Sequence, residues 1–194
     1  MARALETSTP EELVEGNVDR LEAEGTFHFL ILLMKDQEMA YTDDRVDGYS
    51  AQLQVLEGEH AGKSLGITLY DGNASHKDSG AFARKKQTAF FIAANLLTPQ
   101  QMGQSITIDE TQGAGAQVIA KIKYGKENDK TGKRYLDIDG LHVFHVDDPR
   151  AENVPKNATE LAQINPAFRR DAAFFEPILP KVGHAKSKFD NSGL

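Results

Sequence analysis

The sequence predicts a mainly β fold of the α+β class, with five strands and one helix between the third and the fourth strand. Residues 47–56 and 64–70 alternate strictly between apolar and polar side chains, as half-buried strands do. Apolar residues then recur at helical spacing over 78–97, and strand character returns over 116–124 and 134–146. The 194 residues are enough for one domain with extensions at both ends.

The N-terminal part of the chain is acidic and is predicted to start with a helix. Residues 1–44 hold 3 basic and 11 acidic residues. Thr9 suits the N-cap and Pro10 the first position of a helix over 10–24, and acidic residues follow in its first turn. We therefore expect residues 1–24 to form an acidic arm, which either keeps the protein soluble or competes with an anionic ligand for a basic surface.

Three strands are expected next. Residues 26–34 are apolar on both faces, which indicates a central strand covered on both sides. The two alternating strands are joined by the glycine-containing loop "EGEHAG", which suits a hairpin. Their inward residues are Tyr49, Ala51, Leu53, Val55, Leu65, Ile67 and Leu69, and their outward residues are Ser50, Gln52, Gln54, Ser64, Thr68 and Tyr70.

A helix and two further strands complete the domain. The helix over 78–97 should end before Pro99. Two strands, joined by a turn rich in Lys, Asn, Asp and Gly, follow it, and after Pro149 the chain is punctuated by prolines. The apolar stripe predicted to face the core consists of Phe82, Ala89, Phe90, Ala93, Leu96 and Leu97.

This order of elements is that of the OB-fold, a small five-stranded Greek-key barrel. The expected organisation is an acidic N-terminal helical arm, an OB-fold domain and an irregular C-terminal extension, over residues 1–24, 25–148 and 149–194 respectively.

The outward face of the second and third strands is polar but carries no charge, which suits the edges and rings of unpaired bases. Lysines and arginines that would follow the phosphates stand beside it, interleaved with tyrosines in "KIKYGK" and "KRY". A second basic cluster, "RKK" at 84–86, lies in the first turns of the predicted helix, where cations oppose the helix dipole and an external anion would be favoured. The ordinary alternatives are a soluble hairpin tip and a solvated helix face.

Composition and motifs restrict the chemistry. The chain has no cysteine, its longest apolar run is the eight residues 27–34, and its N-terminus lacks a hydrophobic signal core, so we expect a soluble, cytoplasmic protein without a membrane segment. His142 and His145 are metal-ligand types, but positions three apart on a strand face opposite ways. We expect no metal site, no cofactor and no catalytic residue. A metal-dependent nuclease that uses Asp109, Glu110, Asp137 and Asp139 is the weakest alternative.

The runs "GYSAQLQVLEGEHAGKSLGITLY" and "VIAKIKYGKENDKTGKRYLDIDG", with the basic helix between them, resemble phage-encoded single-stranded DNA-binding proteins of the OB type. The resemblance covers about residues 25–146. It implies a non-catalytic protein that coats single-stranded DNA in phage replication or recombination, in the host cytoplasm. It also places Tyr49, Tyr70, Lys121, Lys123, Tyr124 and Tyr135 at sheet or hairpin positions that such proteins use.

Candidate partners are single-stranded DNA, replication or recombination proteins, and further copies of the chain. The alternative function is a protein-interaction module, such as a phage structural or host-inhibitory protein, that uses the same sheet face. Residue pattern and resemblance together give these candidate nucleic-acid-binding residues: Tyr49, Gln52, Gln54, Lys63, Tyr70, Arg84, Lys85, Lys86, Lys121, Lys123, Tyr124, Lys126, Lys133, Arg134 and Tyr135.

Overall fold

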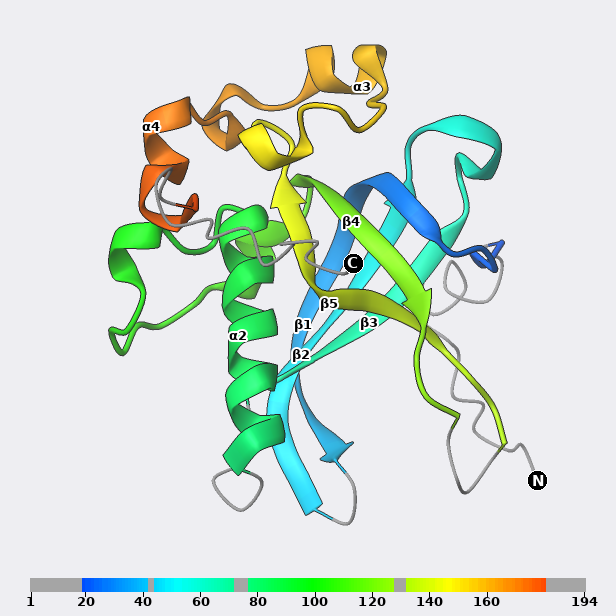
Figure 1. Ribbon diagram of the computed structural model, residues 1–194, viewed down its shortest axis with the longest axis vertical. Helices are drawn as coiled ribbons and strands as arrows, with labels where there is room; N and C mark the ends of the chain where they lie inside the picture. Colours follow the sequence, from blue (N-terminus) through cyan, green and yellow to red (C-terminus); the bar gives the residue numbers. More distant parts are fainter. Residues whose placement is uncertain (1–18, 42–43, 72–76, 128–131, 181–194) are drawn as a thin grey trace, which may run out of the picture.

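The protein forms a five-stranded antiparallel sheet with the strand order β3-β2-β1-β4-β5 (Figure 1). The computed structural model describes residues 19–41, 44–71, 77–127 and 132–180. The strands are β1 (Gly25–Tyr41), β2 (Asp44–Val55), β3 (Ser64–Tyr70), β4 (Gln117–Tyr124) and β5 (Leu136–His145). The mainly β, α+β class and the five predicted strands are therefore confirmed. β1 and β2 extend beyond their predicted ends.

The topology is a Greek key, because β1, β2 and β3 are consecutive neighbours and β4 returns to lie beside β1. The connection from β3 to β4 contains the helix α2 (Lys77–Ala93), as predicted. β3 and β5 are the two edges of the sheet and do not pair in the described chain, so the sheet is not closed and does not show the expected OB-fold barrel. α2 packs against both of these edge strands.

The register places the two faces of the alternating strands as their sequence pattern predicts. Leu53 pairs with Leu65 and Ala51 with Ile67, and these side chains are buried in the core. The intervening pairs, Ser50 with Thr68 and Gln52 with Gly66, face the other way. Between Ile31 and Leu33 the β1 register shifts by one residue. This irregularity lets Ile31 stay in the core while Leu33 joins the outward face.

The prediction that the apolar stripe of the helix faces the core is only partly confirmed. Phe90, Ala93 and Leu97 are buried in the core, although Leu97 lies after the last residue of α2. Phe82 was expected to share this face, but its side chain is 48% exposed. The first turns of α2 extend past β5 in Figure 1, so this end of the helix is not covered by β5.

The predicted N-terminal helix is wrong for the residues that the structure describes. Residues 10–18 lie outside the described residues, and 19–24 are extended rather than helical. Arg20 forms a parallel bridge with Ser64. The Leu21 N–H donates to the Ser64 carbonyl, and the Ser64 N–H donates to the Asp19 carbonyl, each at 2.8 Å. Edge strands carry unpaired backbone groups, and pairing with β3 also buries Leu21, so 19–24 belong to the sheet domain.

The C-terminal extension packs on the sheet over residues 149–180. Its apolar side chains, with Ala151 and Ile164 fully or nearly buried, cover Ile119 and Val146 beside the main core. The last residues of the predicted polar tail, 181–194, lie outside the described residues. Within the described ranges, none of the helices has the length and apolar character needed to cross a bilayer. The elements are η4 (Pro149–Ala151), α3 (Ala158–Gln163), η5 (Pro166–Phe168), α4 (Ala172–Phe175) and η6 (Glu176–Ile178).

A chain of buried and partly buried hydrogen bonds, which we call the seam, ties this extension to the sheet. His28 Nε2 lies 3.0 Å from Gln117 Oε1, and the Asn157 N–H donates to His28 Nδ1 at 3.1 Å. The Gln117 amide donates to the Glu160 carbonyl, and the Asn157 amide donates to the Leu56 carbonyl. Since Nδ1 accepts, His28 must be neutral and must carry its proton on Nε2. Burial accordingly lowers the pKa of His28 from 6.5 to about 4.

Candidate nucleic-acid interface

A groove of about 620 Å³ lies between the outward face of β1–β3 and the β4–β5 hairpin. Two rows of paired residues form its floor, because Lys35 pairs with Ser50 and Ser50 with Thr68, while Leu33 pairs with Gln52. The groove therefore lies over the neutral sheet face that the alternating pattern predicts.

The polar side chains of the floor are open to a ligand. Ser50, Gln52 and Thr68 are half-buried and form no side-chain hydrogen bond with the described part of the chain. Each can donate and accept, so together they offer hydrogen bonds without charge. Such groups suit the neutral edges of bases or of a peptide backbone.

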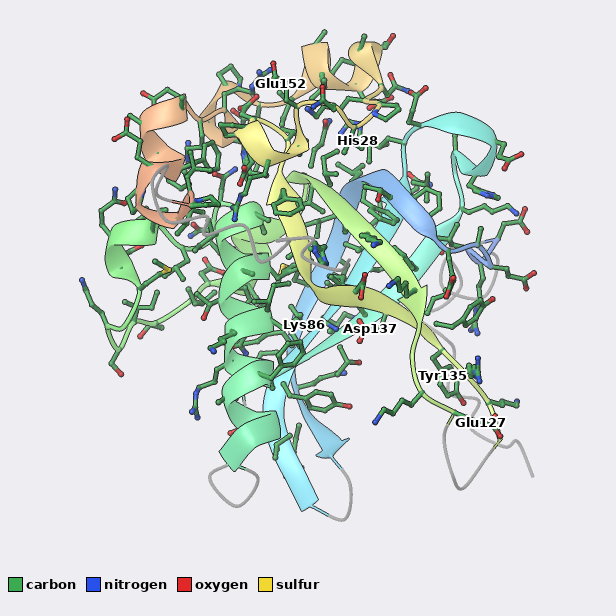
Figure 2. All side chains as sticks on the ribbon, viewed as in Figure 1. His28, Lys86, Glu127, Tyr135, Asp137 and Glu152 are labelled. Carbon is green, nitrogen blue, oxygen red and sulfur yellow. The ribbon has the colours of Figure 1, made fainter. Side chains whose placement is uncertain are left out.

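Aromatic residues of the hairpin form the wall of the groove. Tyr135 is 58% exposed and lies on the side of the molecule away from α2 (Figure 2). Tyr124 is 41% exposed and is held in place, because its hydroxyl donates to the Glu22 carbonyl at 3.0 Å and its N–H donates to Glu24 Oε1 at 2.8 Å. The N-terminal residues 19–24 thus support one ring, while the other is exposed to solvent.

The charge around the groove is positive. Among the described lining residues, Arg20, Lys35 and Arg134 are cationic and Glu22 is acidic. All four side chains are exposed; Lys35 stands at the end of the floor row that it forms with Ser50 and Thr68, and the rest of the floor is neutral. A ligand with neutral groups in the middle and negative charge along its edge matches this distribution.

Several predicted site residues on the first three strands lie outside the groove. Tyr49 packs edge-on against Phe91 of α2 with ring centroids 5.1 Å apart, and burial, followed by Asp71, raises the pKa of its hydroxyl. Gln54 donates to the Gly62 carbonyl at 3.3 Å within the β2–β3 loop. Lys63 and Tyr70 are half-buried and do not line the groove.

The lysines of the β4–β5 hairpin also lie apart from the groove lining. The ammonium groups of Lys121 and Lys123 lie 3.3 and 3.1 Å from the same carboxylate oxygen of Asp139. The hydrogen bond from Lys123 lowers the pKa of Asp139. Lys126 and Lys133 are exposed near the hairpin tip and do not line the groove.

The basic helix cluster divides into two parts. Lys86 is largely buried, and its ammonium lies 2.5 Å from Asp137 Oδ2 between α2 and β5, as Figure 2 shows. Arg84 and Lys85 are exposed and line a different pocket. Because α2 begins at Lys77, both lie in the middle of the helix, and the helix-dipole argument for an anion site does not apply to them.

The histidines and carboxylates considered as chemical groups have structural partners. His145 is buried and shares hydrogen bonds with Asn95 and Phe168, and burial lowers its pKa. His142 is exposed and lies near the Asp139 carbonyl, and Asp109 caps η3 (Glu110–Gly113). Among the residues that the structure describes, no group of three or more metal-ligand side chains gathers.

Sequence reasoning missed part of the groove. Arg20, Leu33, Lys35 and Leu136 line it without having been candidates. Lys35 directly follows the apolar run 27–34, so an expected first strand that was one residue longer would have included it. Arg20 gave no such signal, because its position depends on a pairing with β3 that lies more than forty residues away in the sequence.

No family model, no curated protein and no solved structure matches this chain.

Proposed function

We propose that this protein binds single-stranded DNA in the groove without catalysing a reaction. The observation that carries the proposal is the meeting of three features at one place: a neutral hydrogen-bonding floor, the exposed Tyr124 and Tyr135 rings, and a rim with Arg20 and Arg134. Single strands are bound by this combination of stacking platforms and positive charge.

Each feature has a defined task in this proposal. Tyr135 stacks on a base, since its ring is exposed and its neighbours leave it accessible. Gln52, Ser50 and Thr68 bond to base edges, and Arg134 and Arg20 neutralise phosphates along the rim. Neutral floor groups do not select a particular base strongly, so binding depends little on sequence.

The fold supports the same proposal. The Greek-key order and the helix between β3 and β4 are those of an OB-type domain, which is described as a partly open barrel. Together with the resemblance to phage single-stranded DNA-binding proteins, this supports a role in phage DNA replication or recombination, in the host cytoplasm.

A protein-binding groove is the second candidate, and one observation favours it. Lys121 and Lys123 share the single carboxylate of Asp139, which offsets one of their two positive charges, so the positive charge of the hairpin is smaller than the two lysines suggest. A peptide strand could use the same neutral floor for backbone hydrogen bonds.

A fluorescence titration with a labelled oligonucleotide at several salt concentrations separates these candidates. Single-strand binding predicts that log affinity falls linearly with log salt, with a slope of about 0.7 for each phosphate contact. A chain that binds no oligonucleotide at low salt, while remaining folded by circular dichroism, would exclude the DNA-binding proposal and favour the protein-binding groove.

A further inference from the structure

A second pocket, of about 670 Å³, lies between α2, β5 and the C-terminal extension. Its lining includes an apolar part, with Ile92 and Val143 buried and with Met102 and Leu141 each 41% exposed. Two large apolar side chains at one opening form a surface suited to an apolar ligand group. We call this cavity the helix pocket.

The local backbone explains why Leu141 stands at this opening. Between Ala120 and Ile122 of β4, the paired residues of β5 change from Val143 to Ile138, so β5 contains extra residues at this point. Gly140 has a φ of +61°, a left-handed conformation that glycine adopts without strain, and it allows β5 to bend. The bend interrupts the inward–outward alternation and directs Leu141 outward.

The rim of the helix pocket is cationic. Arg84 and Lys85 are exposed on α2 and form no ion pair with the described part of the chain. Arg150 also lines the pocket, but Asp148 neutralises it at 2.6 Å. The matching ligand is therefore a short segment with apolar side chains in the middle and carboxylates beside them.

The chain itself contains such a segment. Residues 11–15 read Glu-Glu-Leu-Val-Glu, in which Leu13 and Val14 are flanked by three carboxylates. Asp19, where the described chain starts, pairs with the edge of β3, and Figure 1 shows this start on the side of the molecule away from α2. From Asp19, the link to Glu15 can reach at most about 14 Å, so the arm starts from the β3 edge of its own copy.

We propose that residues 11–15 of one copy dock in the helix pocket of a second copy. Leu13 and Val14 enter beside Met102 and Leu141, and the flanking glutamates pair with Arg84 and Lys85. The contact joins two different surfaces, so it links copies head to tail and can continue along a row. The proposal does not depend on the groove or on its ligand.

Sedimentation velocity of the full-length protein over a range of concentrations at low salt tests this contact. We expect wild-type protein to self-associate, and added salt to weaken the association. A pocket variant, Arg84→Glu with Lys85→Glu, and an arm variant, Leu13→Ser with Val14→Ser, should each weaken association about tenfold or more. A matched variant, Lys126→Glu with Lys133→Glu, makes the same charge change on the hairpin and should associate like wild type.

Mixing the two defective variants gives the sharpest result. The pocket variant keeps an intact arm and the arm variant keeps an intact pocket, so the mixture should form a heterodimer that neither variant forms alone. Circular dichroism of each variant shows that it is folded. A monomeric wild-type protein, a hairpin control that dissociates like the pocket variant, or a mixture without heterodimers would overturn the proposal.

Discussion

The groove and the seam both contain several polar side chains, but those of the seam are hydrogen-bonded within the protein and several of those of the groove are not. In the seam, His28, Gln117 and Asn157 are hydrogen-bonded to one another or to backbone carbonyls. In the groove, Gln52 and Thr68 have no side-chain partner in the described chain. Polar groups that are hydrogen-bonded within the protein hold the fold together, whereas polar groups without a partner in the protein are available to bind a ligand.

The same contrast separates the basic residues. Lys86 forms an ion pair with Asp137, and Lys121 and Lys123 form ion pairs with Asp139. Arg134, by contrast, is exposed at the groove rim and has no partner among the described residues. Cations that look alike in the sequence therefore have different tasks.

The largest effect is expected from acid acting on the seam. The pKa of His28 is about 4 in the folded protein against 6.5 unfolded, so between these values the unfolded chain binds the proton more readily. His28 should contribute stability fully above pH 6.5 and lose about 3 kcal/mol of it as the pH falls through about 4.

Urea unfolding between about pH 7 and pH 4.5 measures this loss, with His28→Gln as the comparison. The variant should be less stable at neutral pH and should lose the part of the pH dependence that His28 contributes, while the part from buried His145, whose pKa burial also lowers, remains. An unchanged pH dependence in the variant would show that His28 is not the group that titrates.

The next largest effect, on DNA affinity, is expected from removing the exposed ring of Tyr135. Tyr135→Ala should cost on the order of 1–3 kcal/mol of binding free energy for single-stranded DNA, with little change of salt slope. Phe82→Ala is the matched control, because Phe82 is also an exposed ring but lies on α2 outside the groove. Equal losses in the two variants, measured by oligonucleotide titration, would contradict stacking in the groove.

A smaller effect, on protein stability, is expected when a cation that forms an ion pair within the protein is removed. Lys86→Met breaks the ion pair with Asp137 and should cost about 1 kcal/mol of stability, or about 2–4 °C in Tm. Oligonucleotide affinity should stay unchanged, because this pair lies between α2 and β5. A drop in affinity without a drop in Tm would instead assign Lys86 to the interface.

The smallest effect is a change of salt dependence at the rim. Arg134→Ala should flatten the slope of log affinity against log salt by about 0.7, the value for one phosphate contact on a single strand. The double change of Lys121 and Lys123 to Ala should leave the slope unaltered, since neither side chain lines the groove. The reverse pattern would move the binding face to the outer side of β4.

Local pattern predicted much of the fold. Alternation in β2 and β3 was enough to separate Leu53 and Leu65 from Gln52 and Thr68, because neighbouring residues of a strand face opposite ways. The same rule placed the neutral floor of the groove. Tyr135 and Arg134 followed from the basic and aromatic composition of the hairpin.

Long-range partners could not be predicted in this way. Asp137 and Asp139 decide which lysines are paired, and the bridge between Arg20 and Ser64 keeps residues 19–24 out of the helix that the local pattern predicts for them. Phe82 fits the predicted apolar stripe of the helix, but its side chain is exposed. These outcomes depend on which elements meet in space, and a single sequence does not encode that in its local spacing.

The central claim is that the groove binds unpaired bases, and a comparison of single-stranded with duplex DNA tests it most directly. Labelled oligonucleotides of the same sequence, single-stranded and annealed, are titrated with the full-length protein at the same low salt concentration. The account predicts clearly tighter binding of the single strand, because only unpaired bases can stack on Tyr135. Equal affinity for the two forms, or tighter binding of the duplex, would contradict it.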